Sequence, residues 1–501
     1  MDRRSSAEYG VPAIVLMERA GLAVFEAVKG LATPGSKVTV VCGSGNNGGD
    51  GHVVARLCLE AGYQVECIST AEPGNMSPEC SQQMLQAEAQ GVRPVLHGDP
   101  RWARRLQCLV QSDLIVDAVL GIGAQGEVRG PAREAIEAMN RSGVPVLSVD
   151  VPSGIDADTG QELGESVWAV ATVTFGMPKP FLFQGTGLEH SGHWIVADIG
   201  IPSDLLSTPT SAKLICPVRT MGSIPERLRS SHKGSNGHVL IVAGSEPLRG
   251  AAVLCARAAF RSGAGMVTVA SVGPVLDAVM AQVPEACLLP LETEDGAIAR
   301  SSAERVIADQ HRYSAAVFGP GLTHGDTVRE TLASIWSRWE TPSCIDADAL
   351  NAVACGVPLP PCACVLTPHP GEMSRIVGAS VGDIQSDRFA AVTAAVRQTG
   401  MTVVLKGAYS ILGSPDEPLV VNTTGNPGMA SAGMGDVLSG VTAALLGQGL
   451  APADAGLCAM YWHGYAGDIC AERLAPIGFT ASDVADALPV ARAKLTECAG
   501  S

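Results

Sequence analysis

The sequence predicts an α/β protein with two domains, each built on a parallel sheet that has helices on both faces. The chain has 501 residues, which is more than one hydrophobic core normally organises. Short β-branched segments are followed repeatedly by a glycine-rich or polar turn and then by a segment of helical periodicity. Aromatic residues make up only 4% of the chain, and its abundant small residues suit the contact between helices and sheets.

Composition and charge exclude several kinds of partner. The net charge of −16 argues against a surface that binds nucleic acid or anionic membranes. No segment approaches the ~20 apolar residues of a membrane span, and the start of the chain has no apolar signal core. We therefore expect a cytoplasmic protein that acts on small molecules, with no nucleic-acid or membrane partner.

The 15 cysteines are scattered along the chain. Cys362 and Cys364 form a CxC pair, but no CxxC pair and no Cys/His zinc spacing is present. This pattern predicts reduced, buried thiols.

The first half of the chain begins with an amphipathic helix over residues 10–30, followed by a βαβ unit. The strand Lys37–Cys42 leads into a glycine-rich turn at Gly43–Gly51, a helix follows from His52, and Tyr63–Ser69 forms the next strand.

The glycine-rich turn also matches the dinucleotide-binding pattern G-x-G-x-x-G. Gly43, Gly45 and Gly48 provide the glycines, and Glu66 lies 18 residues beyond Gly48. A dehydrogenase is nevertheless the least favoured interpretation, because Glu66 lies inside its strand and not at the end, where it would meet a ribose.

Three polar turns follow predicted strands in this half. Asn46, Asn47 and Asp50 follow the first strand, and the strands Leu114–Leu120 and Val146–Val151 end in GIGAQGEVRG and PSGIDADTG. Ligands of open parallel sheets collect at the carboxyl ends of the strands. Side-chain carbonyls and carboxylates at that edge predict a site for a cation and a polar ligand, although each turn alone is more often an Asx-capped turn.

A segment rich in proline and serine at roughly 205–225 predicts a linker, with domains at 1–210 and 220–501. In the second domain the same strand, turn and helix pattern predicts a doubly wound parallel sheet. Its expected strands are His238–Ala243, Met266–Ala270, Ala315–Phe318, Ser343–Ile345, Val365–Leu366 and Thr402–Leu405.

The glycine-rich segment Asn422–Gly440 precedes a predicted helix that starts at Val441. Glycines allow backbone amides to point at a ligand, and a helix start favours an anion. Asp436 is badly placed for an anion unless it holds a proton or a hydroxyl group. The alternative is a glycine-rich turn in which Asp436 caps the helix.

The motifs GSGNNGGDG, DAVLGIGAQGEVRG, SVDVPSGIDADTG and TFGMPKP make the first domain resemble the NAD(P)H-hydrate epimerases, which have a Rossmann-like fold. The resemblance implies hydrate contacts at Asn46, Asn47, Gly48, Gly49, Asp50, Gly121, Ile122, Gly123, Ala124, Gln125, Gly126, Glu127 and Asp150. It also implies a potassium ion held by Asn47, Asp117 and Ser153. Asp150 as the catalytic acid/base is our hypothesis. Lys179 lies either near this site or in a solvated loop.

The motifs SHKGSNG, GSEPLRGAA, GPGL, IDADALN, TPHPGE, LKGA and GMGD make the second domain resemble the ADP/ATP-dependent NAD(P)H-hydrate dehydratases of the ribokinase-like superfamily. The resemblance implies Asp436 as the catalytic base that faces the hydrate. It implies hydrate contacts at Ala251, Gly321 and His369, and nucleotide contacts at Lys406, Gly407, Ala408, Tyr409, Ser410 and Gly435, with Mg²⁺ accompanying ADP or ATP.

Some of these assignments have alternatives. Met434 stands where many relatives have a threonine and offers no hydroxyl group to a phosphate, although the backbone amides of Gly433 and Gly435 should still form the anion site. His369 could instead cap a proline-rich turn, and Asp346 and Asp348 could be helix N-caps.

Together the resemblances imply a bifunctional repair enzyme that epimerises (R)- and (S)-NAD(P)H hydrates and dehydrates the (S) form. With ADP as donor the products would be AMP and phosphate, and the sequence leaves the choice between ADP and ATP open. A homo-oligomer is expected from the ribokinase-like relatives. One alternative is a hydroxymethylpyrimidine-type kinase with an accessory Rossmann-like domain; another is a binding scaffold of the kind found in RNA-associated proteins.

Overall fold

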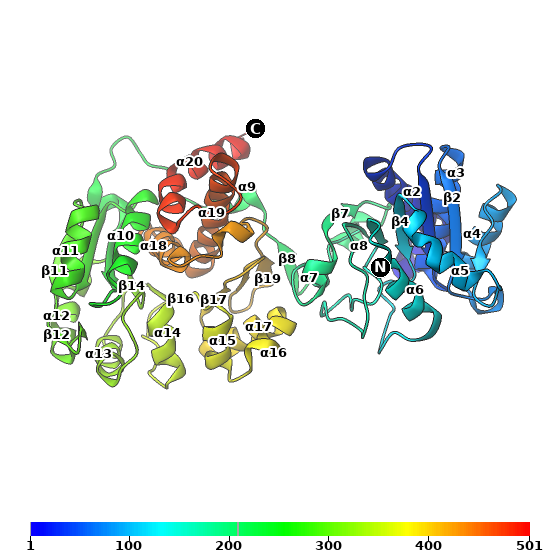
Figure 1. Cartoon of the computed structure of the whole chain (residues 1–501). Helices are drawn as coiled ribbons and strands as arrows, with labels where there is room; N and C mark the ends of the chain where they lie inside the picture. Colours follow the sequence, from blue (N-terminus) through cyan, green and yellow to red (C-terminus); the bar gives the residue numbers. More distant parts are fainter. Residues whose placement is uncertain (1, 208–209, 501) are drawn as a thin grey trace. The chain divides into compact units, whose positions relative to one another are not determined.

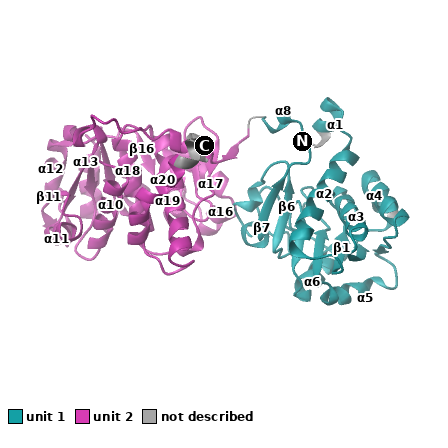
Figure 2. Cartoon of the chain, turned by 90° about the horizontal axis from the view of Figure 1, so that it is seen from above, with its two compact units in different colours: residues 1–209 teal, residues 210–501 magenta. Residues whose placement is uncertain are grey.

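The computed structural model describes residues 2–207 and 210–500. The chain divides into two compact units, residues 1–209 (unit 1) and residues 210–501 (unit 2) (Figure 2). Within the described residues, none of the helices combines the length and the apolar character that crossing a bilayer requires.

Unit 1 contains a seven-stranded sheet in the order β3-β2-β1-β4-β5-β6-β7, and all neighbouring strands are parallel. The strands are β1 (Lys37–Cys42), β2 (Gln64–Ser69), β3 (Val95–Leu96), β4 (Leu114–Ala118), β5 (Val146–Val149), β6 (Ala171–Phe175) and β7 (His193–Ala197). The order reverses between β1 and β4, and ligands of open parallel sheets collect outside the carboxyl ends of the strands at such a position. This arrangement is the Rossmann-like fold expected for the first domain.

Helices cover both faces of this sheet (Figure 1). The helices of unit 1 are α1 (Asp2–Tyr9), α2 (Ala13–Leu31), α3 (Asn46–Glu60), α4 (Pro78–Ala89), α5 (Trp102–Gln107), α6 (Gly130–Ser142), α7 (Gly187–His190) and α8 (Ser203–Leu206). The β-branched strand β1 supplies both cores, because Val40 packs with α2 and α3 while Val41 packs with α5 and α6. A strand buried on both faces explains why β1 reads as a continuous apolar segment.

Helix α3 begins earlier than the sequence predicts. The prediction placed a loop at Gly43–Gly51 and the helix from His52, whereas α3 already begins at Asn46. A Cβ atom at Gly48 would lie 2.1 Å from the carbonyl oxygen of Gly43, so the backbone can pass only if that residue is glycine. Glycine weakens a helix prediction, but here it is required inside the helix.

Unit 2 contains a ten-stranded sheet in the order β11-β10-β9-β14-β15-β16-β17-β18-β19-β8. Its strands are β8 (Ala212–Leu214), β9 (His238–Val242), β10 (Met266–Ser271), β11 (Cys287–Pro290), β14 (Ala315–Phe318), β15 (Ser343–Ile345), β16 (Cys364–Leu366), β17 (Thr402–Leu405), β18 (Ile411–Gly413) and β19 (Leu419–Val421). A separate antiparallel pair is formed by β12 (Thr293–Glu294) and β13 (Ala297–Ile298).

The helices of unit 2 form one layer on each face of the sheet (Figure 1). One layer contains α10 (Arg249–Arg261), α11 (Gly273–Gln282), α18 (Met434–Gly447) and α19 (Pro452–Arg473), with α9 (Pro217–Gly222) and α20 (Ala481–Gly500) packed on it. The other contains α12 (Ala303–Ala308), α13 (Asp326–Trp336), α14 (Ala347–Ala354), α15 (Pro370–Val377), α16 (Val381–Ser386) and α17 (Arg388–Thr399).

Two features of this sheet differ from the sequence prediction. The strands from β11 to β17 are parallel as expected, but β18 pairs antiparallel with both β17 and β19. The connections on either side of β18 are too short for the helical crossover that a parallel pair needs. In addition β8, which lies inside the segment expected as a linker, pairs with β19 and is part of this sheet.

Helix α18 also begins earlier than predicted, at Met434 and not at Val441. Gly433 precedes it with a left-handed φ of 89°, which glycine adopts without strain. Asp436 therefore lies in the first turn of a helix and not in a loop.

Candidate functional site

A buried carboxylate organises the crevice of unit 1. Asp117, at the carboxyl end of β4, has no exposed surface. Its Oδ2 atom accepts hydrogen bonds from the Ser148 hydroxyl (2.9 Å) and the Ser153 amide (2.8 Å), and its Oδ1 atom accepts one from the Ser153 hydroxyl (2.5 Å). Burial raises the pKa of Asp117, and the bonds from Ser153 and Ser148 oppose that effect.

Two of the three residues expected to hold a potassium ion contact one backbone carbonyl, and the third contacts one of those two. The Asn47 side-chain amide donates to the oxygen of Leu120 (2.9 Å), and the Ser153 hydroxyl lies 3.3 Å from the same oxygen. Ser153 in turn binds Asp117. Carboxylate, amide, hydroxyl and carbonyl oxygens are the ligands that hard cations prefer, so this donor set fits potassium.

Asp150 follows β5 and adopts a left-handed backbone, with φ of 63°. A non-glycine residue in this region is strained by about 1–3 kcal/mol, and such strain often occurs at functional sites. The Oδ1 atom of Asp150 accepts hydrogen bonds from Lys179 Nζ (2.6 Å), the Phe175 amide (3.1 Å) and the Thr174 hydroxyl (3.2 Å). Among the described residues no donor reaches Oδ2, so that oxygen is available to a ligand.

Lys179 is therefore part of the site and does not lie in a solvated loop. Its ammonium group also lies 2.6 Å from the Thr174 hydroxyl, and its side chain is 19% exposed. The ion pair places a positive charge beside Oδ1 of Asp150.

The other expected hydrate contacts lie in the segments that follow β1 and β4. Asn46, Asn47, Gly48, Gly49 and Asp50 form the first turns of α3. The loop of Gly121, Ile122, Gly123, Ala124, Gln125, Gly126 and Glu127 follows β4, and a Cβ atom at Gly121 would lie 3.3 Å from Asn47. Glu127, at the far end of this loop, pairs with Arg129 at 2.8 Å.

In unit 2, charged side chains from separate elements meet at the carboxyl edge of the sheet. Lys406, which follows β17, places its Nζ atom 2.6 Å from Asp346 Oδ1 and 3.7 Å from Glu372 Oε2. Asp346 follows β15, and its Oδ2 atom accepts a hydrogen bond of 2.6 Å from Ser439 of α18. Burial would lower the pKa of Lys406, but Asp346 and Glu372 outweigh it and raise the pKa.

Asp436 lies beside this cluster in the first turn of α18. Burial, with a smaller contribution from Asp346, raises the pKa of Asp436 from 3.8 to about 7. A carboxyl group that titrates near neutral pH is well suited to accept a proton from a hydroxyl group. A Cβ atom at Gly435 would lie 3.2 Å from Lys406 Nζ, so the free amides at the start of the helix and the lysine share one site for an anion.

The structure brings two of the expected hydrate contacts together and gives the third a second role. A Cβ atom at Gly321, after β14, would lie 2.9 Å from that of Ala251 in the first turn of α10. His369 caps α15, because its Nδ1 atom accepts hydrogen bonds from the amides of Gly371 (3.0 Å) and Glu372 (3.3 Å). The side chain is about half exposed, so capping leaves one face of the ring for a ligand.

The expected nucleotide segment Lys406–Ser410 connects β17 to β18. Tyr409 has a left-handed φ of 50°, and Gly407 has a φ of 139°, so Gly407 and Tyr409 are in backbone conformations that L-residues rarely adopt. Ser410 donates from its hydroxyl to the oxygen of Gly407 at 3.1 Å, and Ala408 lies between them. The ammonium group of Lys406 is turned toward Asp346 and Glu372.

Sequence reasoning did not assign several residues that shape this site. Asp346 was considered only as a helix cap, but its carboxylate makes no cap bond and binds Lys406 and Ser439. Asp468 of α19 accepts hydrogen bonds from the Gly425 amide (3.0 Å) and the Asn426 side chain (2.9 Å), which shapes the glycine-rich loop. These partners lie 42 to 93 positions apart, so no local pattern reveals them.

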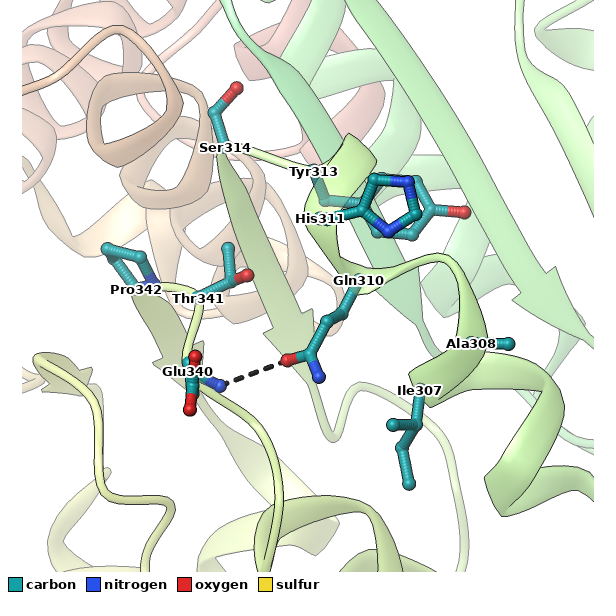
Figure 3. Close-up of a pocket in the computed structure, with 9 residues that line it drawn as sticks. All are labelled: Ile307, Ala308, Gln310, His311, Tyr313, Ser314, Glu340, Thr341 and Pro342. Carbon is teal, nitrogen blue, oxygen red and sulfur yellow. Dashed lines mark hydrogen bonds between the residues drawn. The ribbon is translucent and has the colours of Figure 1, made fainter.

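A pocket of about 460 Å³ lies at the opposite edge of the sheet in unit 2 (Figure 3). It is lined by Ile307, Ala308, Gln310, His311, Tyr313, Ser314, Glu340, Thr341 and Pro342. Ser314 immediately precedes β14, and Pro342 immediately precedes β15. Because ligands of parallel sheets collect at the carboxyl ends, and the buried charges lie there, we do not assign this pocket to the functional site.

Comparisons with known proteins match both units. A family model described as NAD(P)H-hydrate dehydratase matches residues 239–490, and one described as YjeF-related protein N-terminus matches residues 13–181. A bifunctional NAD(P)H-hydrate repair enzyme from Moorella thermoacetica is 37% identical over 99% of this chain and 96% of its own length. The enzyme of the same description from Escherichia coli is 33% identical over 96% of this chain and 90% of its own length.

Among solved structures, an ADP/ATP-dependent NAD(P)H-hydrate dehydratase from Bacillus subtilis, co-crystallised with ATP and Mg²⁺, has a TM-score of 0.51. The two chains are 29% identical, and the match covers 56% of this chain and 98% of the Bacillus chain.

Proposed function

The chain belongs to the family of bifunctional NAD(P)H-hydrate repair enzymes, and we propose that unit 1 epimerises the hydrates beside Asp150 while unit 2 dehydrates the (S) form beside Asp436. The observation that carries this assignment is that each unit has an aspartate at the carboxyl edge of its own sheet: Asp150 is buried and paired with Lys179, and Asp436 is partly buried with its pKa raised to about 7.

For unit 1 we propose that Asp150 uses Oδ2 to move a proton on the bound hydrate. The Lys179 ammonium group would bind Oδ1 of Asp150 and keep the carboxylate oriented through the reaction. Asn46, Gly48, Gly49, Asp50 and the loop from Gly121 to Glu127 would contact the substrate. Potassium held by Asn47, Asp117 and Ser153 would supply a positive charge near these loops, and the oxygen donors around Leu120 support that choice.

For unit 2 we propose that Asp436 accepts the proton of the hydrate hydroxyl group. The hydroxyl oxygen then attacks the terminal phosphorus of ADP or ATP, and the bond from that phosphorus to the bridging oxygen breaks, which releases AMP or ADP. Phosphate is a better leaving group than hydroxide. It departs with the bonding electrons, and loss of a ring proton restores NAD(P)H.

The surrounding residues position this transfer. The amides of Gly433 and Gly435, together with Lys406, would bind the transferred phosphoryl group, and Gly407, Ala408, Tyr409 and Ser410 would bind the rest of the nucleotide. Ala251, Gly321 and His369 would contact the hydrate. Magnesium bound with the nucleotide would neutralise charge on its phosphates.

The test is the recovery of reduced-nicotinamide absorbance from a mixture of (R)- and (S)-NADH hydrate, with ADP, ATP or neither. Complete, nucleotide-dependent recovery supports both activities and identifies the donor. Recovery that stops at the (S) share contradicts the epimerase. We expect Asp150→Asn to stop there and Asp436→Asn to recover nothing, and a variant with the wild-type rate would remove that residue from its role.

One prediction about the whole protein and one rival function accompany this proposal. We propose a homo-oligomer, which light scattering with size-exclusion chromatography measures directly. Of the alternatives, a hydroxymethylpyrimidine-type kinase would instead accumulate a phosphorylated pyrimidine alcohol.

A further inference from the structure

Two cysteines and a histidine meet inside unit 1, away from the proposed catalytic groups. Cys42 ends β1, Cys67 lies on the neighbouring strand β2, and His52 projects from α3, which packs on both strands. The sulfur atoms of Cys42 and Cys67 are 3.9 Å apart, and Cys67 Sγ is 3.7 Å from His52 Nδ1. One ligand atom from each of the three residues lies within 4.8 Å of the others.

These separations are close to those around a tetrahedral metal ion. Zinc binds sulfur at about 2.3 Å and imidazole nitrogen at about 2.0 Å, which sets neighbouring ligand atoms roughly 3.5 to 3.8 Å apart. The observed distances of 3.9 and 3.7 Å need only a small contraction. The three residues come from three different elements, so the arrangement depends on the fold and has no signature in sequence spacing.

The burial of this group also favours a metal ion. Cys42 and His52 have no exposed surface, and Cys67 is 3% exposed. A buried imidazole is costly unless its polar atoms are satisfied, and a zinc ion at Nδ1 would satisfy that nitrogen better than the long 3.7 Å contact with the Cys67 thiol. Two thiolates neutralise a divalent cation, so the assembled site carries no net charge into the apolar core.

A third sulfur atom lies near the group. Cys80 of α4 is fully buried, and its thiol donates to the carbonyl oxygen of Gly43 at 3.7 Å. It does not belong to the set of ligand atoms that lie within 4.8 Å of one another, so it stays outside the group. Sulfur and imidazole ligands are typical of structural zinc sites.

The backbone around the group is shaped to admit the Cys42 sulfur. A Cβ atom at Gly51 of α3 would lie 2.8 Å from Cys42 Sγ, so this helical position must be glycine for the sulfur to lie under the helix. Gly51 comes directly after the segment Asn46–Asp50, and the group therefore lies beneath the turns expected to contact the hydrate.

We propose that Cys42, His52 and Cys67 bind a structural zinc ion, which ties β1, β2 and α3 together beneath the substrate-binding turns. The ion would enter as unit 1 folds, because the ligands are buried, and would stabilise the folded state. This inference does not depend on the proposed function.

The first measurement is the metal content of the full chain, expressed without a histidine tag and dialysed against metal-free buffer. We expect one zinc ion per chain. His52→Ala and Cys67→Ser should lose it, and Cys58→Ser is the matched control, because Cys58 is a fully buried cysteine of α3 in the same core but outside the group. Limited proteolysis, which cuts unfolded segments, shows whether unit 1 of each variant chain is still folded.

The second measurement uses the wild-type chain alone, so it does not depend on how the variants fold. The chain is unfolded with a chelator and refolded with Co²⁺. Thiolate-to-cobalt charge transfer and the visible bands of tetrahedral cobalt should appear in a one-to-one ratio. A wild-type chain without stoichiometric zinc and without cobalt bands overturns the proposal. Zinc that persists in both variants, or a disulfide between Cys42 and Cys67 in the metal-free protein, also overturns it.

Discussion

The Asp436→Asn substitution tests whether burial of the carboxyl group at the start of α18 destabilises the folded chain. Its pKa is raised from 3.8 to about 7, chiefly by burial. Such a group ionises more readily in the unfolded chain than in the folded one, so it destabilises the fold once the pH rises above its unfolded pKa. Asparagine cannot ionise and is free of this cost.

The size of the effect follows from the difference between the two pKa values. One pKa unit corresponds to about 1.4 kcal/mol, so the substitution should raise the free energy of unfolding by at most about 4 kcal/mol. The gain is absent below a pH of about 4, grows as the pH rises toward 7, and stays constant above that value.

Hydrogen exchange of the peptide that covers α18 is the suitable assay, because a chain with two units does not unfold in one step. Protection of Met434–Gly447 in the variant, relative to the wild type, should increase between about pH 5 and about pH 8. The control is Asp454→Asn, which removes an exposed aspartate from the first turn of α19 and should change protection by less than about 1 kcal/mol.

The reasoning is refuted if Asp436→Asn protects α18 no better at pH 8 than the wild type does. That result would mean that the carboxylate is solvated or paired in the folded chain. The assignment of Asp436 as a base with a pKa near neutrality would then lose its physical support.

Three further predictions test other parts of the chain. Lys179→Met should slow epimerisation about 100-fold and leave dehydration unchanged. Lys179→Arg should retain more epimerase activity, because it keeps the charge beside Asp150. Equal epimerase rates for both variants and the wild type would contradict the role of the ion pair. Gly43→Ala should lower the midpoint of thermal unfolding by several degrees, since its Cβ would lie 1.8 Å from the oxygen of Val119, whereas Gly45→Ala, in open space, should change it little. Chelation of magnesium should abolish dehydration, measured as absorbance recovery from pure (S)-hydrate, and loss of epimerisation as well would contradict separate metal requirements in the two units.

The positions of the strands could be predicted from the sequence because burial on both faces leaves a local signal. The segments Lys37–Cys42, Ala315–Phe318 and Thr402–Leu405 are strands with the expected bounds. The starts of α3 and α18 were predicted wrongly, because glycine normally opposes helix formation, whereas here close backbone contacts require it. Those contacts are made with residues distant in sequence or across a tight turn, so local propensity gives the opposite answer.

The sequence indicated the polar turns of the candidate site but not the ion pairs between distant residues. The turns after β1, β4 and β5 carry the polar residues expected of them. The pairs Asp150–Lys179 and Asp346–Lys406 join positions 29 and 60 residues apart, and their geometry exists only once the sheet has brought the strand ends together. The functional roles of the individual site residues remain predictions.

Gly440, in the middle of α18, also limits how unit 2 can move. A Cβ atom there would lie 2.3 Å from the carbonyl oxygen of Cys255, so α10 and α18 touch backbone to backbone. Because a contact this close leaves no room for sliding, the two helices should behave as one rigid body. The start of α10 carries Ala251 and the start of α18 carries the amides proposed to bind the phosphoryl group, so under the proposed function the distance between hydrate and phosphoryl donor would be set during folding and not by a closing movement. Efforts to widen the substrate range should therefore alter the loops that face α10 and α18 and leave the contact between these two helices unchanged.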